Sequence, residues 1–181
     1  MAVLIEAYSV VIRLETIADK YPGGVDQYIK DCPNQTFCMD DEIARVGFMH
    51  GADAHDFIGS LERCGFRCVV DDEYDEVVLV DQFRGIDIPC EWLEYGRLVI
   101  FEGDLRIAIC MINGNTVDSV AFPAGWVYEH SLSKQAMVID SGIDSNRLTF
   151  LRHENGCDCY LDTLTGKEMF IERTIKRNAN A

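Results

Sequence analysis

The sequence predicts an α+β protein, with a ferredoxin-like split βαβ half packed against an antiparallel, β-rich half. Over roughly the first eighty residues, hydrophobic patterns follow the order strand, helix, strand, strand, helix, strand. After Gly85 helical periodicity nearly disappears, and hairpin-forming turns accumulate. We therefore expect a ferredoxin-like sandwich over residues 1–84, an antiparallel β-rich half over residues 85–175, and a disordered tail over residues 176–181.

The first half is expected to begin with one long central strand. Residues 2–13 are rich in Val and Ile and almost continuously apolar, which is typical of a strand covered on both faces. Apolar residues then recur at spacings of three and four between residues 14 and 32, with an interruption at residues 22–24. This pattern predicts a short helical turn, a break, and a second helix over residues 25–31.

A hairpin is predicted next. Residues 36–39 and 43–49 are strand-like runs joined by three acidic residues. Alternation along the second run places Val46 and Phe48 towards the core and Arg45 outward.

The helix that follows has recognisable ends. Asp53 can cap its first turn and Gly65 can end it. Phe66 is expected to fold back onto the buried face of this helix, and residues 77–80 supply the last strand of the first half.

The second half is expected to be mostly hairpins. A short helix over residues 91–95 (EWLEY) is the main exception. The strand-like runs lie between Gly-containing turns, at residues 98–101, 105–112, 117–122, 137–139, 148–152, 159–161 and 169–172.

The net charge is −15, from 31 acidic and 16 basic residues. Such a charge repels nucleic-acid phosphates and anionic lipid surfaces, so we expect neither partner. It suits a basic protein partner, a divalent cation, or simply solubility. The one compact basic cluster along the sequence is Arg173, Lys176 and Arg177.

The first residues carry Glu6 and lack a basic leader, so they predict a strand and not an export signal. No apolar run approaches the ~20 residues that span a bilayer. We therefore expect a cytoplasmic protein in which the eight cysteines are thiols, mostly filling core space.

Three residues are candidates for catalysis: Cys90, His55 and His130. Cys90 would open the predicted helix over residues 91–95, where the helix dipole favours a thiolate. His55 lies in a His- and Asp-rich stretch at the start of a helix, where His-Asp pairing can orient an imidazole. The alternative is that Cys90 is a packing residue and that the histidines lie on the surface.

Zinc is the one metal that the sequence raises. His153, Cys157 and Cys159 provide three soft ligands within seven residues. Paired C-x-x-C motifs, which usually mark structural zinc sites, are absent. Core thiols are therefore the alternative, and no cofactor is expected.

Two segments are candidates for binding a protein partner. One is an acidic run that could contact a basic surface, and the other is an aromatic turn whose side chains could either bind a partner or close the end of a sheet. Their residues are Asp71, Asp72, Glu73, Asp75 and Glu76, and Phe122, Trp126 and Tyr128.

The common nucleotide-binding and hydrolase motifs are absent from the sequence. We therefore expect a non-enzymatic protein-interaction module, with an antidote or immunity protein against a basic toxin as an analogy of size and charge. A homo-oligomer is compatible with the sequence. The alternative is a small-molecule sensor or a cysteine-dependent enzyme with a cleft between the two halves.

Overall fold

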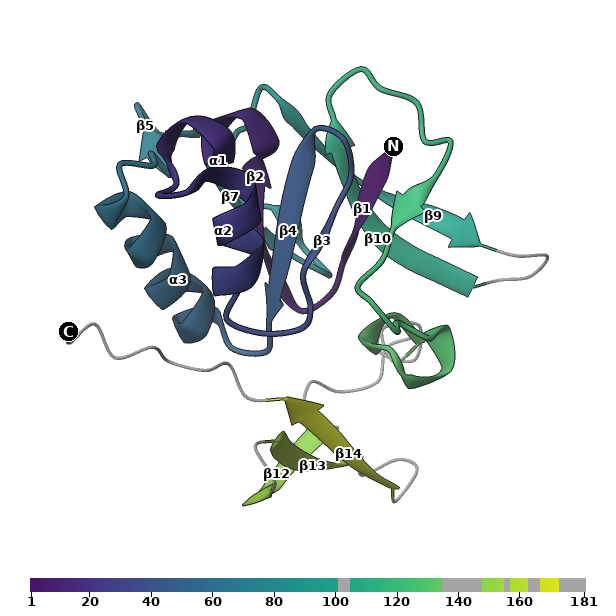
Figure 1. Ribbon diagram of the computed structural model, residues 1–181. Coiled ribbons are helices and arrows are strands. Elements are labelled where there is room, and N and C mark those ends of the chain that lie inside the picture. The colour runs from purple at the N-terminus through teal and green to yellow at the C-terminus, as the bar shows by residue number, and fades with distance from the viewer. Residues whose placement is uncertain (101–104, 135–147, 155–156, 163–166, 173–181) are drawn as a thin grey trace.

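The protein has three layers, as the computed structural model shows (Figure 1). The residues described are 1–100, 105–134, 148–154, 157–162 and 167–172. Within them, three α-helices cover one face of a five-stranded sheet, and a four-stranded sheet covers its other face. The predicted α+β class is confirmed at this level. The predicted tail over residues 176–181 and the predicted strand over residues 137–139 lie outside the described residues.

The five-stranded sheet is antiparallel at every pairing, in the order β3-β4-β2-β7-β8. Its centre is β2, which confirms the prediction of a central strand near the N-terminus. The strands are β2 (Tyr8–Arg13), β3 (Cys38–Met39), β4 (Ile43–Phe48), β7 (Val77–Asp81) and β8 (Gly85–Ile86).

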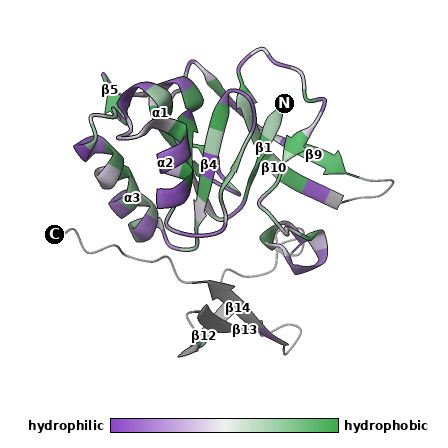
Figure 2. Cartoon of the chain, viewed as in Figure 1, coloured by the Kyte–Doolittle hydropathy of each residue, from purple (hydrophilic) through white to green (hydrophobic). Residues whose placement is uncertain are grey.

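The helices are α1 (Leu14–Lys20), α2 (Gly24–Asp31) and α3 (Gly51–Arg63). Their apolar faces pack on the side chains that alternate along β2, β4 and β7, including Val10, Val46 and Val77. In Figure 2 these helices carry both hydrophilic and hydrophobic residues, as expected for an outer layer with one buried face.

The ends of α3 differ partly from the prediction. The helix starts at Gly51, so Asp53 lies in the first turn, and the N-cap position belongs to His50. Gly65, with a φ of 89°, ends it as predicted, because that backbone conformation strongly favours glycine. Phe66 folds back, with its backbone N–H donating to the carbonyl of Leu61, and its side chain is buried.

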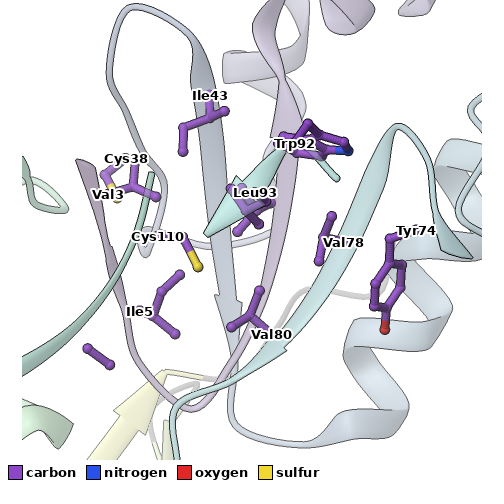
Figure 3. Packing of buried hydrophobic residues seen from close by; sticks show 12 residues of the cluster. Val3, Ile5, Cys38, Ile43, Tyr74, Val78, Val80, Trp92, Leu93 and Cys110 are labelled. Atoms are coloured by element: carbon purple, nitrogen blue, oxygen red, sulfur yellow. The ribbon is translucent and has the colours of Figure 1, made fainter. Parts of the chain in front are cut away.

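The second sheet has the order β11-β1-β10-β9. Its inner face meets the five-stranded sheet in a shared core, in which Val3, Ile5 and Cys110 lie near Val78 and Val80 (Figure 3). The strands are β1 (Ala2–Ile5), β9 (Leu93–Ile100), β10 (Leu105–Ile112) and β11 (Val120–Ala121).

The N-terminal run is two strands and not one. Between β1 and β2 the chain passes from one sheet to the other at Glu6 and Ala7, and Ala7 has a φ of 50°. Each strand is nevertheless covered on both faces, which is why the hydrophobic pattern is continuous. Because β1 pairs with β10 and β11, the two halves share a sheet across the predicted boundary at residue 84.

Two further expectations concern the second half. Residues 91–95 are not a helix, because Leu93 and Tyr95 alternate with Glu94 in β9 and point into the core between the sheets.

The late strands exist as β12 (Leu148–Glu154), β13 (Cys157–Asp162) and β14 (Lys167–Glu172), which form an antiparallel three-stranded sheet. Further elements are the hairpin of β5 (Val69–Val70) and β6 (Glu73–Tyr74) and the 3-10 helix η1 (Tyr128–His130), and residues 132–134 are also helical. Among the described residues, no helix is both long and apolar enough to cross a bilayer.

Arg45 does not face solvent. It points away from the helices, as alternation predicts, but the second sheet covers that face and leaves Arg45 only 1% exposed. The guanidinium donates from Nε to Ser9 Oγ (2.8 Å), from Nη1 to the Thr36 carbonyl (2.9 Å) and from Nη2 to the Glu6 carbonyl (2.8 Å). Burial lowers the pKa of Arg45, but a guanidinium stays protonated at neutral pH. The charge is therefore stabilised by hydrogen bonds inside the protein.

Gly47 makes room for this guanidinium. A Cβ atom at Gly47 would lie 2.5 Å from Arg45 Nη2 and 2.8 Å from Arg45 Cζ, closer than van der Waals contact allows. The carbonyl of Gly47 accepts hydrogen bonds from Asn34 Nδ2 and Thr36 Oγ1, which bring the segment carrying the Thr36 carbonyl against the sheet.

We expect the substitution Gly47→Ala to lower the free energy of unfolding by about 1–3 kcal/mol, the usual cost of overpacking a core. In an Arg45→Met background the same change should cost less, because the clashing guanidinium is gone. Chemical denaturation of the four proteins of this double-mutant cycle measures both costs. Gly59→Ala in α3, where a Cβ meets only Arg63 Nη1 at 3.8 Å, is the control and should not destabilise. Equal costs of Gly47→Ala in both backgrounds would contradict this assignment.

Candidate functional site

The three catalytic candidates lie in three different layers. His55 is exposed on α3, in the helical layer. Cys90 packs against the core between the two sheets, and His130 is exposed in η1, next to a tyrosine that covers the outer face of the second sheet. The structure therefore does not bring the three side chains together.

The local surroundings of Cys90 and His55 differ from those predicted. With β9 in place of a helix, Cys90 has no helix dipole to favour its thiolate, and its neighbour Trp92 is buried. The Nδ1 atom of His55 lies 2.7 Å from the Gly51 carbonyl, one helical turn earlier. Neither arrangement includes the helix dipole or the His-Asp pair that the sequence predicted at Cys90 and His55.

The predicted zinc ligands lie in the three-stranded sheet. His153 is in β12, and its partner across the ladder is Asp158 of β13, which separates Cys157 from Cys159. The side chains of these three candidates lie outside the described ones. Elsewhere in the described part of the chain, no three His, Cys, Asp or Glu side chains are grouped closely enough to hold a metal ion.

The acidic run divides into two parts. Asp71 and Asp72 have φ values of 51° and 65° and form the exposed tip between β5 and β6, followed by the exposed Glu73. By contrast, Asp75 and Glu76 take part in ion pairs within the protein. The first three carboxylates are exposed, whereas Asp75 and Glu76 are partly buried.

The ion pairs join α1 and the segment after α3 to the two residues that precede β7. Lys20 Nζ lies 2.7 Å from Glu76 Oε2, Arg67 Nη2 lies 3.1 Å from Glu76 Oε1, and Arg67 Nε lies 2.8 Å from Asp75 Oδ2. Glu76 also accepts from the backbone N–H of Arg67 at 2.8 Å. Burial opposes ionisation of Glu76, but the hydrogen bonds from Lys20 and Arg67 outweigh it and lower the pKa of this carboxyl.

The aromatic turn covers the outer face of the second sheet. Tyr128 is buried against Ala2, Leu4, Ile107 and Ile109, which point away from the five-stranded sheet. Tyr128 therefore covers a face of the sheet, whereas the alternative predicted from the sequence was closure of a sheet end.

The turn also presents apolar surface to solvent. The rings of Phe122 and Trp126 stack with centroids 4.4 Å apart, and Trp126 meets Tyr128 edge-on at 6.2 Å. Phe122 is 36% exposed and Val127 52% exposed. The aromatic surface, defined as Phe122, Trp126 and Val127, is therefore both fixed in place and accessible.

The aromatic surface and the acidic tip are far apart. The β5–β6 hairpin lies beyond α1 at the left of Figure 1, whereas β11 and the segment after it lie beside the second sheet at the right. The two predicted partner-binding segments are thus separate surfaces.

Three arginines that are scattered along the sequence lie together beside β9. Arg106 of β10 is directly opposite Val99, and Arg97 precedes Val99 by two residues on the same face. Arg97 Nη2 donates to the Phe83 carbonyl at 3.3 Å, which places Arg84 beside them. The sequence signalled no cluster here, because only the register of the β9–β10 hairpin brings these residues together.

No protein-family model, no curated protein and no solved structure matches this chain. Function must therefore be inferred from the geometry of the chain itself.

We expect Glu76→Gln to lower the free energy of unfolding by about 1 kcal/mol at neutral pH, because it weakens charge-assisted hydrogen bonds. Since the pKa of Glu76 is lowered on folding, its contribution is complete above its ordinary value of 4.5 and is lost as the pH falls through the lower folded value. Denaturant unfolding of both proteins at several pH values measures the difference. The matched change Glu73→Gln at the exposed tip should have little effect, and a pH-independent loss for Glu76→Gln would contradict the assignment.

Burial raises the pKa of Cys32 to about 12 and that of Cys68 to about 11. We therefore expect both thiols to be alkylated at neutral pH more slowly than a model thiol, and at the model rate once the protein is unfolded. Mass spectrometry of single peptides measures each rate. In the same experiment, a Cys90 that reacts faster than the model thiol would support its nucleophilic role, and a rate no faster would contradict it.

Proposed function

We propose that this protein is a non-enzymatic interaction module that binds a protein partner through the aromatic surface. The observation that carries the proposal is the stacked pair of Phe122 and Trp126, held on a sheet yet partly exposed. Large aromatic side chains in fixed positions are typical of the residues that dominate binding energy at protein interfaces.

The surface is supported from beneath and from both ends. Tyr128 fills the space against the sheet, and Ser131 Oγ donates to the Tyr128 carbonyl at 2.8 Å. Two residues further on, Ser133 donates from its backbone N–H (2.9 Å) and from Oγ (2.6 Å) to Glu6 Oε1. A surface held in this way loses little conformational entropy on binding, which favours affinity.

The charge around the aromatic surface favours a basic partner. Glu94 lies on the same outer face of the sheet, directly opposite Met111, and is exposed. Asp118 is exposed two residues before β11. With a net charge of −15, these carboxylates would attract a basic partner, as an antidote protein attracts a basic toxin.

We further propose that the first half follows the ferredoxin-like arrangement. The order β3-β4-β2-β7, with α1 and α2 between β2 and β3 and α3 between β4 and β7, supports this assignment. The addition of β8 and the position of β1 in the second sheet depart from it. The arrangement supports no particular activity, because the same architecture serves many.

The test is affinity capture with variants that change one surface at a time. The full chain should capture a partner from native lysate at low salt, and Phe122→Ser with Val127→Ser should weaken that capture by about tenfold or more. The matched control is Ile29→Ser with Met39→Ser, which removes two other exposed apolar side chains, 37% and 39% exposed, from α2 and β3.

Higher salt should weaken the capture, because the carboxylates are exposed and screened. Capture of nothing at low salt, or equal loss in the control pair, would contradict the proposal. Circular dichroism of each variant verifies that it folds.

A further inference from the structure

The two main sheets end in very different edges. Three of their four edge strands in the described residues, β3, β8 and β11, have two residues each, and short edges offer little to pair with. The fourth, β9, has eight residues and is hydrogen-bonded to one described strand, β10.

The register shows which backbone groups of β9 point to the outer edge. Asn113 donates its backbone N–H to the Trp92 carbonyl at 2.8 Å, so these opposite residues form a hydrogen-bonded pair. Along an antiparallel ladder, hydrogen-bonded pairs alternate with pairs that are not hydrogen-bonded. The backbone of Leu98 is therefore hydrogen-bonded to β10, and the N–H and C=O groups of Val99 point away from β10.

The first part of this edge is already occupied. Tyr95 Oη donates to the Gln82 carbonyl at 2.6 Å, and a Cβ atom at Gly85 of β8 would lie 2.8 Å from the Tyr95 ring. The accessible part therefore lies towards the C-terminal end of β9, around Val99, whose side chain is 56% exposed.

Arginines gather at this part of the edge, and the carboxylate of Asp81 lies beside them, accepting hydrogen bonds from the backbone N–H groups of Phe83 (2.7 Å) and Arg84 (2.9 Å). We define the β9 edge surface as Phe83, Arg84, Arg97, Val99 and Arg106. Both Arg84 and Arg106 are exposed, and among the described residues no carboxylate lies within ion-pair distance of either. Phe83, 42% exposed, adds apolar area.

These arginines disfavour a second copy of the chain as the occupant. Two β9 strands paired antiparallel would bring two sets of like charges together, and charged residues on an edge strand commonly prevent such self-pairing. An acidic strand would instead be attracted to this edge, because a guanidinium can bind a carboxylate with two hydrogen bonds. The carboxylate of Asp81 is engaged by backbone N–H groups, and charges farther away than about 8 Å are screened at physiological ionic strength.

We propose that the β9 edge surface binds an extended acidic segment of a partner protein, which adds a strand to the second sheet beside β9. The backbone of Val99 supplies hydrogen bonds, Phe83 and Val99 supply apolar contact, and Arg84 and Arg106 select carboxylates. This site is separate from the aromatic surface and does not depend on the function proposed for it.

The test uses a short capped peptide in which Glu alternates with Val and Thr, titrated into the full chain by calorimetry and by amide NMR. We expect saturable binding with a dissociation constant in the millimolar range or tighter and amide shifts centred on Val99. The same peptide with Lys in place of Glu should bind at least about tenfold more weakly. Two N-methylated versions of the Glu peptide, one methylated on odd residues and one on even residues, test the backbone contact. One version should bind about tenfold more weakly, because its methyl groups replace the N–H groups that face β9, and the other should bind normally.

Two variants assign the binding to this surface. Arg84→Glu with Arg106→Glu should weaken binding of the Glu peptide by about tenfold, whereas Lys30→Glu with Arg63→Glu, the same change in net charge on the helical layer, should not. Val99→Pro removes an outward N–H without removing a β9–β10 hydrogen bond and should weaken binding similarly. The variant Phe122→Ser with Val127→Ser should bind the peptide normally, which separates this site from the aromatic surface.

The proposal would be overturned if the Glu peptide does not bind at several millimolar, or if the Lys peptide binds equally well. It would also be overturned if neither N-methylated peptide binds more weakly than the unmodified one. A dimer, detected by sedimentation, that Val99→Pro abolishes would likewise overturn it, because the edge would then be occupied by a second copy. If Val99→Pro does not fold, the N-methylated peptides test the backbone contact without altering the protein.

Discussion

The architecture depends on one buried cation. Where the chain crosses from the second sheet to the first, the guanidinium of Arg45 donates to the Glu6 carbonyl and to Ser9 Oγ. It also donates to the Thr36 carbonyl, and so joins the crossover segment and the segment before β3 to β4. An isolated charge in this position would be costly, and three hydrogen bonds from one rigid group offset that cost. The absence of a side chain at Gly47 is part of the same arrangement. These residues therefore satisfy a buried charge at the point where the chain passes between the two sheets.

Much of the fold could be predicted from hydrophobic periodicity. The predictions that were wrong share one cause, which is that the pattern within a segment does not show which other segments pack against it. Alternation correctly turned Arg45 away from the helices, but it cannot show whether another layer covers that side, and here the second sheet does. Likewise, residues 2–13 are apolar throughout because two strands are each buried on both faces, and nothing in that pattern marks the break at Ala7. The run EWLEY has the propensity of a helix, but pairing with β10 and burial of Leu93 override it.

The candidate site was predictable in one part and not in others. The sequence distinguished the aromatic turn from its surroundings, since Phe122, Trp126 and Tyr128 lie close together along the chain. It could not show that Asp75 and Glu76 are engaged by Lys20 and Arg67, because those contacts join residues far apart in sequence. The arginines beside β9 are found only through strand register, and the separation of His55, Cys90 and His130 only through the layers. Features formed by residues close together in the sequence could be predicted from it, whereas features formed by contacts between distant residues could not.

The position of β1 has a consequence for biosynthesis. This strand is synthesised about a hundred residues before its neighbours β10 and β11. Until β10 and β11 are synthesised, the apolar residues of β1 have no neighbouring strand, and the hydrogen bonds from Ser133 to Glu6 form later still. Since contacts of such long range are slow to form, β1 lacks both of its neighbouring strands during the early stages of folding. A fragment ending before β10 would retain this exposed strand indefinitely, so the N-terminal half is not a module that evolution could readily detach and reuse.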